Sequence, residues 1–214
     1  MTRFTDILRD ENQPAWDRAV THEFVQGVYD GSVPDAAMAR YLVQDHRFLD
    51  SFLALLGGAM ATADSTAARL RLGQFVGMVS TTENTYFLRS FDALGVTQAA
   101  RDATPDAAPT TGFSNLMREA AISGSYAACL SVLNVAEWLY LDWASRAPQP
   151  LPDNFVHAEW ITLHDNPDFR DFVAFLRAEL DRVGPQDAET CRDFFGRAVK
   201  LENDFFDMAM TDAV

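Results

Sequence analysis

Residues 41–52, with the sequence YLVQDHRFLDSF, carry the pattern that decides the fold. Tyr41, Asp45, Phe48 and Phe52 follow one another at intervals of four, three and four residues, which places them on one face of an α-helix. Almost every other segment has the same helical period, and no alternating stretch longer than about four residues resists a helical interpretation. The sequence therefore predicts an all-α protein.

Glycine, asparagine and proline residues mark the ends of the predicted helices. Gly31 and Gly95 follow helical segments, Asn166 precedes a proline that opens the next segment, and Gly184 stands before Pro185. Helices are predicted at residues 4–20, 22–30, 35–63, 66–94, 110–122, 124–146, 153–163, 167–183 and 186–211, with long connections at 96–109 and 147–152. Because neither connection separates halves of different composition, residues 1–214 are predicted to form a single domain.

Two short motifs inside these helices are interpreted as local structure. Gly57 and Gly58 are adjacent within a helix and indicate close packing, since no phosphate-loop pattern surrounds them. The polar run 80–82 before Glu83 is interpreted as helix surface with a kink.

The composition is strongly acidic, with 31 Asp and Glu against 17 Lys and Arg and a net charge of -14. Phosphate groups are bound by clustered basic side chains, so nucleic acid and anionic membranes are not expected as partners. The longest apolar stretch, 52–61, is ten residues long, about half of what a bilayer crossing needs. No signal peptide is indicated, and Cys129 and Cys191 form no CxxC motif. We therefore expect a cytoplasmic protein.

Three carboxylates lie on helix faces that are otherwise apolar. Asp45 belongs to the stripe quoted above, Glu137 shares a face with Tyr140, and Glu202 shares one with Phe205. Burying an ionised carboxylate without a partner costs several kcal/mol. Each of these acids therefore needs an explanation.

Two interpretations of the three acids remain open. Any one of them is explained by an internal salt bridge to an arginine such as Arg40 or Arg197. Three of them within aromatic stripes favour a shared pocket lined by Tyr and Phe. In such a pocket the carboxylates repel one another, so we expect at least one raised pKa.

Acids that converge from several helices suggest either a di-metal centre or a site for a flat, nitrogen-rich ligand. A di-metal centre needs Glu-x-x-His pairs, and no His of the sequence has Glu three residues before it. His157 and His164 share a helix face but lie about 10.5 Å apart by helical rise. Neither a metal nor another cofactor is expected. Carboxylates do accept hydrogen bonds from ring amino groups, aromatic faces stack on rings, and a carboxylate can activate water.

With these residues the chain resembles the TenA family, the thiaminase II or aminopyrimidine aminohydrolase proteins. The blocks that match in order are an opening block with Trp16, residues 22–27, 30–31 and Pro34, then 41–48, then 160–161 with His164 and Phe169, and finally 201–206. The resemblance implies the haem-oxygenase-like helical bundle of that family, without haem. It also implies a homo-oligomer, either a homodimer or a homotetramer.

The chain departs from the family pattern at one position that bears on chemistry. Better-known members have a cysteine nucleophile four residues before a tyrosine that Tyr140 matches, and here Ala136 stands at that place. Glu137 instead matches a second branch, in which a glutamate replaces the cysteine. Neither Cys129 nor Cys191 matches a catalytic cysteine.

The resemblance implies a role for each matching residue. Asp45 would bind the amino group and ring nitrogen of a pyrimidine, Glu137 would activate water, and Glu202 would act as acid or base. The implied substrate-binding residues are Tyr41, Phe48, Phe113, Tyr140, His164 and Phe205. Phe48, Phe113 and His164 stand where the cysteine branch tends to have tyrosines, which alters the hydrogen-bond pattern.

The function implied is hydrolysis of a C–N bond on a 4-amino-2-methylpyrimidine from thiamin breakdown, in thiamin salvage. The substrate would be an aminopyrimidine or an N-formyl-aminomethylpyrimidine, and thiaminase activity would be weak or absent. Two alternatives stay open. One is a non-catalytic metabolite-binding or regulatory protein of the same fold, and the other is a haem-oxygenase-like metal oxidase.

Overall fold

The computed structural model describes residues 2–211, which form helices and no strand. The α-helices are α1 (Phe4–Glu11), α2 (Gln13–Val20), α3 (Glu23–Asp30), α4 (Asp35–Thr62), α5 (Thr66–Met78), α6 (Asn84–Ala93), α7 (Gln98–Ala103), α8 (Ala108–Ile122), α9 (Tyr126–Ala144), α10 (Phe155–His164), α11 (Pro167–Val183) and α12 (Ala188–Met210). A π-helical turn, η1 (Val79–Glu83), joins α5 to α6, and a 3-10 turn, η2 (Gly184–Asp187), precedes α12. The all-α prediction is confirmed.

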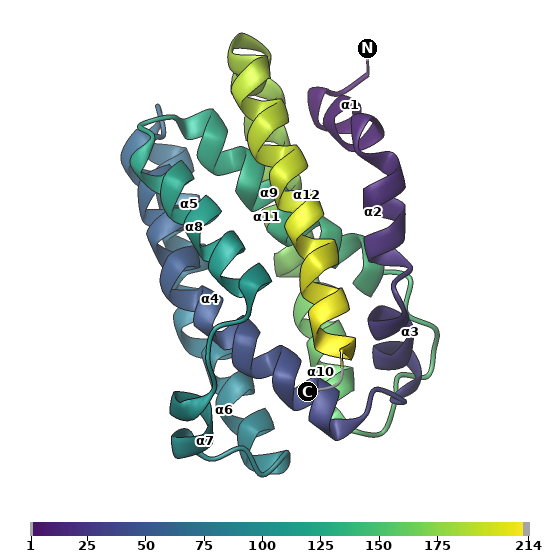
Figure 1. Cartoon of the computed structure of the whole chain (residues 1–214). Coiled ribbons are helices and arrows are strands. Elements are labelled where there is room, and N and C mark those ends of the chain that lie inside the picture. Colours follow the sequence, from purple (N-terminus) through teal and green to yellow (C-terminus); the bar gives the residue numbers. More distant parts are fainter. Residues whose placement is uncertain (1, 212–214) are drawn as a thin grey trace.

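Helix α9 forms the centre of the bundle. It packs against α2, α4, α8, α10, α11 and α12, and nearly all of its residues are buried. A helix that is apolar on every side belongs in a core, so this position follows from its sequence. Figure 1 shows α4, α5 and α8 on one side of the molecule, α9, α11 and α12 in the middle, and α1 to α3 on the other side.

The predicted start and stop signals act as expected. Gly31 and Gly95 adopt left-handed φ values of 75° and 67° after α3 and α6, a conformation that glycine reaches without strain. The side chain of Asn166 accepts a hydrogen bond of 3.0 Å from the backbone N–H of Phe169 and so caps α11.

Three predicted boundaries are wrong, each for a local reason. Residues 4–20 form two helices, because Pro14 lacks the N–H that a continuous helix needs. Residues 66–94 are interrupted by η1 at the place of the expected kink. The predicted connection 96–109 contains α7, which Thr97 caps by accepting from the N–H of Ala100.

The two adjacent glycines of α4 provide a matched pair for testing the packing of α4 on α8. A Cβ added to Gly58 would lie 2.6 Å from Cα and 2.7 Å from the carbonyl oxygen of Ala121, whereas a Cβ on Gly57 would meet nothing within 4 Å. We expect Gly58→Ala to lower the free energy of unfolding by about 1 to 3 kcal/mol through overpacking. Gly57→Ala should raise it by about 0.5 to 1 kcal/mol, since alanine favours the helix. Urea unfolding of both variants checks this, and effects of equal sign would contradict the close approach.

Candidate active site

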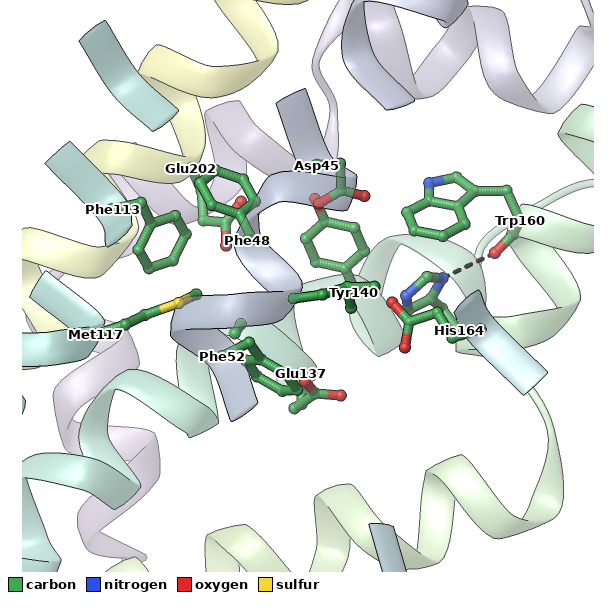
Figure 2. A pocket seen from close by; sticks show the side chains of 13 residues that line it. Asp45, Phe48, Phe52, Phe113, Met117, Glu137, Tyr140, Trp160, His164 and Glu202 are labelled. Carbon is green, nitrogen blue, oxygen red and sulfur yellow. Dashed lines mark hydrogen bonds between the residues drawn. The ribbon is translucent and has the colours of Figure 1, made fainter. Parts of the chain in front are cut away.

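A pocket opens in the interior of the bundle, between α4, α8, α9, α10, α12 and η1. Its space measures about 490 Å³, mouth included. Seven of the nine residues predicted for the site line it: Asp45, Phe48, Phe113, Glu137, Tyr140, His164 and Glu202. Figure 2 shows these side chains arriving from different helices around one space. The helical spacing therefore does turn the three predicted carboxylates toward a common cavity.

The other two predicted residues, Tyr41 and Phe205, lie behind the pocket wall. Both are fully buried. The Tyr41 hydroxyl lies 2.7 Å from the hydroxyl of Tyr140, and the ring of Phe205 lies 4.8 Å from that of Phe48. Each thus supports a residue that lines the pocket.

Aromatic rings make up the wall around the carboxylates. The Phe48 ring meets Phe113 edge-on, with centroids 5.5 Å apart, and Tyr140 packs against His164 at 4.9 Å. Edge-on and tilted pairs of this kind hold rings in fixed orientations. Trp160 adds a further ring to the lining.

The three predicted acids have no charged partner. The Oδ2 atom of Asp45 is buried without a hydrogen bond, and within residues 2–211 no hydrogen bond or ion pair reaches the carboxylate of Glu137 or Glu202. These two side chains belong to residues only 7% and 2% exposed. Unpaired carboxylates at this depth are costly unless they serve a ligand.

Neither Arg40 nor Arg197 forms the salt bridge to a pocket carboxylate that was considered as an alternative explanation of the three acids. Arg40 donates to the carbonyl of Ala209, and Arg197 pairs with Glu119 and Asp193 at the surface. No arginine or lysine is among the described residues that line the pocket.

Glu83 is a fourth carboxylate of the pocket that was not predicted from the sequence. It is the last residue of η1 and lines the pocket together with Glu137. The interpretation of the preceding polar run as helix surface placed Glu83 outside the core. The signal was nevertheless present, because Phe75, Val79 and Glu83 follow at intervals of four residues, the spacing that identified the other three acids.

The electrostatics of the pocket favour protonated carboxyl groups when it is empty. Burial, followed by the charge of Glu83, raises the pKa of Asp45 and of Glu137 well above the usual range. Burial, followed by the charge of Asp45, raises the pKa of Glu202 in the same way. Burial raises the pKa of Glu83 to about 7. The predicted raised pKa is thus confirmed, and a cationic ligand would reverse it by stabilising the ionised forms.

The raised pKa of Glu83 predicts a pH dependence of stability. The folded protein holds this proton more tightly than the unfolded chain, so the contribution is present below pH 4.5 and is lost as pH rises toward 7. Between pH 5 and pH 8 the free energy of unfolding should fall by about 2 to 3 kcal/mol more in the wild type than in Glu83→Gln. Urea unfolding of both proteins at the two pH values checks this. Equal slopes would show that Glu83 titrates normally.

His164 contributes an uncharged ring to the pocket. Burial lowers its pKa to about 4. Its Nδ1 lies 2.8 Å from the carbonyl oxygen of Trp160, as the dashed line in Figure 2 marks. A carbonyl only accepts, so Nδ1 carries the proton and Nε2 is left as an acceptor.

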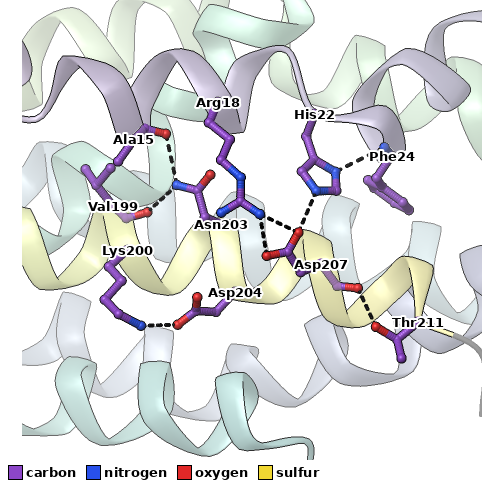
Figure 3. A network of polar contacts seen from close by, with 10 residues as sticks. All are labelled: Ala15, Arg18, His22, Phe24, Val199, Lys200, Asn203, Asp204, Asp207 and Thr211. Carbon is purple, nitrogen blue, oxygen red and sulfur yellow. Dashed lines mark hydrogen bonds and ion pairs between the residues drawn. The ribbon is translucent and has the colours of Figure 1, made fainter.

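A polar network outside the pocket fixes α12, the helix that carries Glu202 (Figure 3). Asn203 donates 2.9 Å hydrogen bonds to the carbonyls of Ala15 and Val199. Asp207 accepts from Arg18 at 2.6 Å and lies 3.1 Å from Nε2 of His22. These contacts connect α12 to α2 and to the start of α3, and so fix the position of Glu202 along the axis of the bundle.

The cysteines lie away from the pocket. Both are fully buried, Cys129 donates to the carbonyl of Ala120 at 3.2 Å, and burial raises the pKa of Cys129 to about 12. Ala136 lines the pocket, and an alanine side chain offers no nucleophile. Among residues 2–211, no three His, Cys, Asp or Glu side chains form a cluster able to hold a metal ion.

These features define an all-helical bundle whose interior pocket is lined by carboxylates and walled by aromatic rings. The chain belongs to the TENA/THI-4/PQQC family, which it matches over residues 9–212. It is similar to the aminopyrimidine aminohydrolase of Halalkalibacterium halodurans, with 22% identity over 98% of this chain and 96% of that protein. It is also 22% identical to the aminopyrimidine aminohydrolase of Bacillus subtilis, over 89% of this chain and 80% of that one.

Solved structures of the family share the fold. The TenA homologue from P. horikoshii OT3 superimposes with a TM-score of 0.87 at 22% identity, covering 97% of this chain and 98% of that one. A TenA family transcription regulator from Silicibacter sp. TM1040 gives a TM-score of 0.86 at 23% identity, covering 98% and 97%. No helix within residues 2–211 is long and apolar enough to cross a membrane.

Proposed function

We propose that this protein is a hydrolase of thiamin salvage that cleaves a C–N bond on a 4-amino-2-methylpyrimidine. The observation that carries the proposal is the convergence of Asp45, Glu137 and Glu202, none of which has a charged partner, on a pocket that no described arginine or lysine lines. Such a pocket complements a flat ligand that brings hydrogen-bond donors and positive charge, as an aminopyrimidine does. The names of the relatives, aminopyrimidine aminohydrolase, support the same class of reaction.

Asp45 orients the substrate in this proposal. Its Oδ2 atom lacks a partner, so it is available to accept hydrogen bonds from the exocyclic amino group and a protonated ring nitrogen of the pyrimidine. The rings of Phe48, Phe113 and Tyr140 surround the space in which the pyrimidine would lie. The ring is thereby fixed before the reaction begins.

Glu137 and Glu202 handle the protons. Glu137 accepts a proton from water as the water oxygen bonds to the carbon of the scissile C–N bond. With an N-formyl substrate, Glu202 delivers a proton to the departing nitrogen, so that the C–N bond breaks and the nitrogen leaves as a neutral amine. The nitrogen of a protonated aminomethyl substrate already carries this proton, leaves as ammonia and then takes up the proton that Glu137 accepted from water. One water is consumed, and with an N-formyl substrate the products are formate and the amine.

We assign the chain to the branch of the family that has glutamate in place of the cysteine nucleophile. Ala136 cannot attack a carbon, and neither cysteine lines the pocket. Covalent addition to the pyrimidine ring is therefore not expected, and thiamin should be turned over weakly or not at all.

The proposal is tested by incubating the purified protein with the aminomethylpyrimidine, its N-formyl derivative and thiamin. Ammonium, formate and the pyrimidine product are each measured, and turnover of one of the first two is expected. A ligand-dependent rise in melting temperature with no product would overturn it in favour of a metabolite-binding protein. A reaction that required stoichiometric iron or manganese would favour the oxidase.

A further inference from the structure

A second pocket adjoins the first. It lies between the α5–η1 segment and the start of α11, and its space measures about 730 Å³, mouth included. Apolar side chains such as Phe75, Met78 and Phe169 form much of its wall, and Asp168 stands among its polar residues. The wall of the second pocket is therefore largely apolar and carries the negative charge of Asp168.

Glu83 and His164 line both pockets and so form the boundary between them. The π-helical turn places Glu83 there, because it is the last residue of η1. His164 is held by the Trp160 carbonyl and is neutral. Of the two residues shared by the pockets, only Glu83 therefore brings a charge to the boundary between them.

The carboxylate of Glu83 has no partner of its own. Within the described part of the chain it makes no hydrogen bond or ion pair, and neither pocket is lined there by an arginine or lysine. A carboxylate with these surroundings attracts a positively charged nitrogen and disfavours an anion such as a phosphate.

We propose that Glu83 is a specificity-determining residue that binds a positively charged nitrogen of the substrate at this boundary, and that the second pocket receives the group which that nitrogen carries. This inference rests on the proposed function, because the pyrimidine must occupy the first pocket for its exocyclic nitrogen to reach Glu83. It adds that an aminomethyl nitrogen, which is cationic, is preferred over the neutral N-formyl nitrogen.

The test compares ligand binding at pH 8, where the Glu83 carboxylate is ionised, in protein that carries Glu137→Gln so that the amine is bound without being hydrolysed. Calorimetry gives the Kd of the aminomethylpyrimidine and of the matching hydroxymethylpyrimidine for this protein with Glu83 and with Glu83→Gln. We expect the substitution to weaken the amine by about 10- to 100-fold, the range for a hydrogen bond to a charged group. The alcohol should change by less than about threefold, since it makes no charged contact.

Asp168→Asn provides a matched control, because Asp168 is exposed and lines the second pocket but not the first. It removes the same charge and should leave the amine-to-alcohol ratio within about twofold, since an exposed charge is screened. An N-propyl derivative of the amine should bind the wild type within about threefold of the parent amine, because its chain enters apolar space.

Each outcome separates this inference from the proposed function. The role of Glu83 would be overturned if Glu83→Gln left the amine-to-alcohol ratio of Kd values unchanged or weakened both ligands equally. It would also be overturned if Asp168→Asn weakened the amine as much as Glu83→Gln does. Rejection of the N-propyl amine would overturn the role of the second pocket. Failure of the wild type to bind the alcohol and the amine would overturn the proposed function itself.

Discussion

Glu137→Gln should lower kcat for the pyrimidine substrate by about 10²- to 10⁴-fold, the range for losing a positioned general base. The amide has the shape of the carboxyl group but cannot accept a proton from water. KM should change little, because Glu137 is assigned to the water and Asp45 to the ring. Steady-state kinetics with the better of the two substrates, together with the Kd of the hydroxymethylpyrimidine, check both halves of this expectation.

The same substitution carries its own control for folding. The pKa of Glu137 is raised by burial and by neighbouring acids, so an ionised carboxylate at this site is unfavourable in the empty protein. A neutral amide removes that cost, and the free energy of unfolding at pH 8 should be unchanged or higher. A loss of activity in a protein that is at least as stable therefore reports on chemistry. Turnover that survives intact would remove Glu137 from its assigned role.

The arrangement of helices could be predicted from the sequence wherever a local signal exists. Gly31, Gly95 and Asn166 end or begin helices because their own chemistry requires it. Pro14 also signals the break between α1 and α2, but the continuous helical period of the apolar residues favoured a single helix there. The polar run 80–82 predicted a kink at the end of α5 but not its π-helical form, because a one-residue bulge leaves the average period almost unchanged.

The depth of a residue in the site could not be predicted in the same way. Helical periodicity correctly turned Asp45 and Glu202 inward, but it placed Tyr41 and Phe205 on the same faces. A side chain reaches the cavity only where no residue of a neighbouring helix lies between the two. Tyr41 does not reach it, because its hydroxyl contacts that of Tyr140, which lines the pocket. A single sequence carries no such information about partners. Glu83 was missed for a different reason, since the polar residues before it outweighed its own spacing.

Asp45→Asn should have the second large effect, and it should fall on binding. Asp45 is assigned to accept hydrogen bonds from the pyrimidine amino group and a protonated ring nitrogen, and an amide offers one acceptor and places an NH2 group against these donors. The loss of charge-assisted hydrogen bonds, worth about 2 to 4 kcal/mol together, predicts a fall in kcat/KM of about 30- to 1,000-fold. Most of the change should appear as a higher KM, in contrast to Glu137→Gln.

Asp50→Asn is the matched control for this prediction. Asp50 lies on the same helix, its side chain is 83% exposed and it pairs with Arg118 at the surface. Removing this charge should leave kcat/KM within about twofold, because an exposed ion pair contributes little and is screened by salt. Equal losses in the two variants would mean that the overall negative charge draws the substrate in, whereas a loss confined to Asp45→Asn places the pyrimidine against that carboxylate. A wild-type value for Asp45→Asn would leave the unpartnered Oδ2 atom without a ligand and would contradict the assigned orientation of the ring.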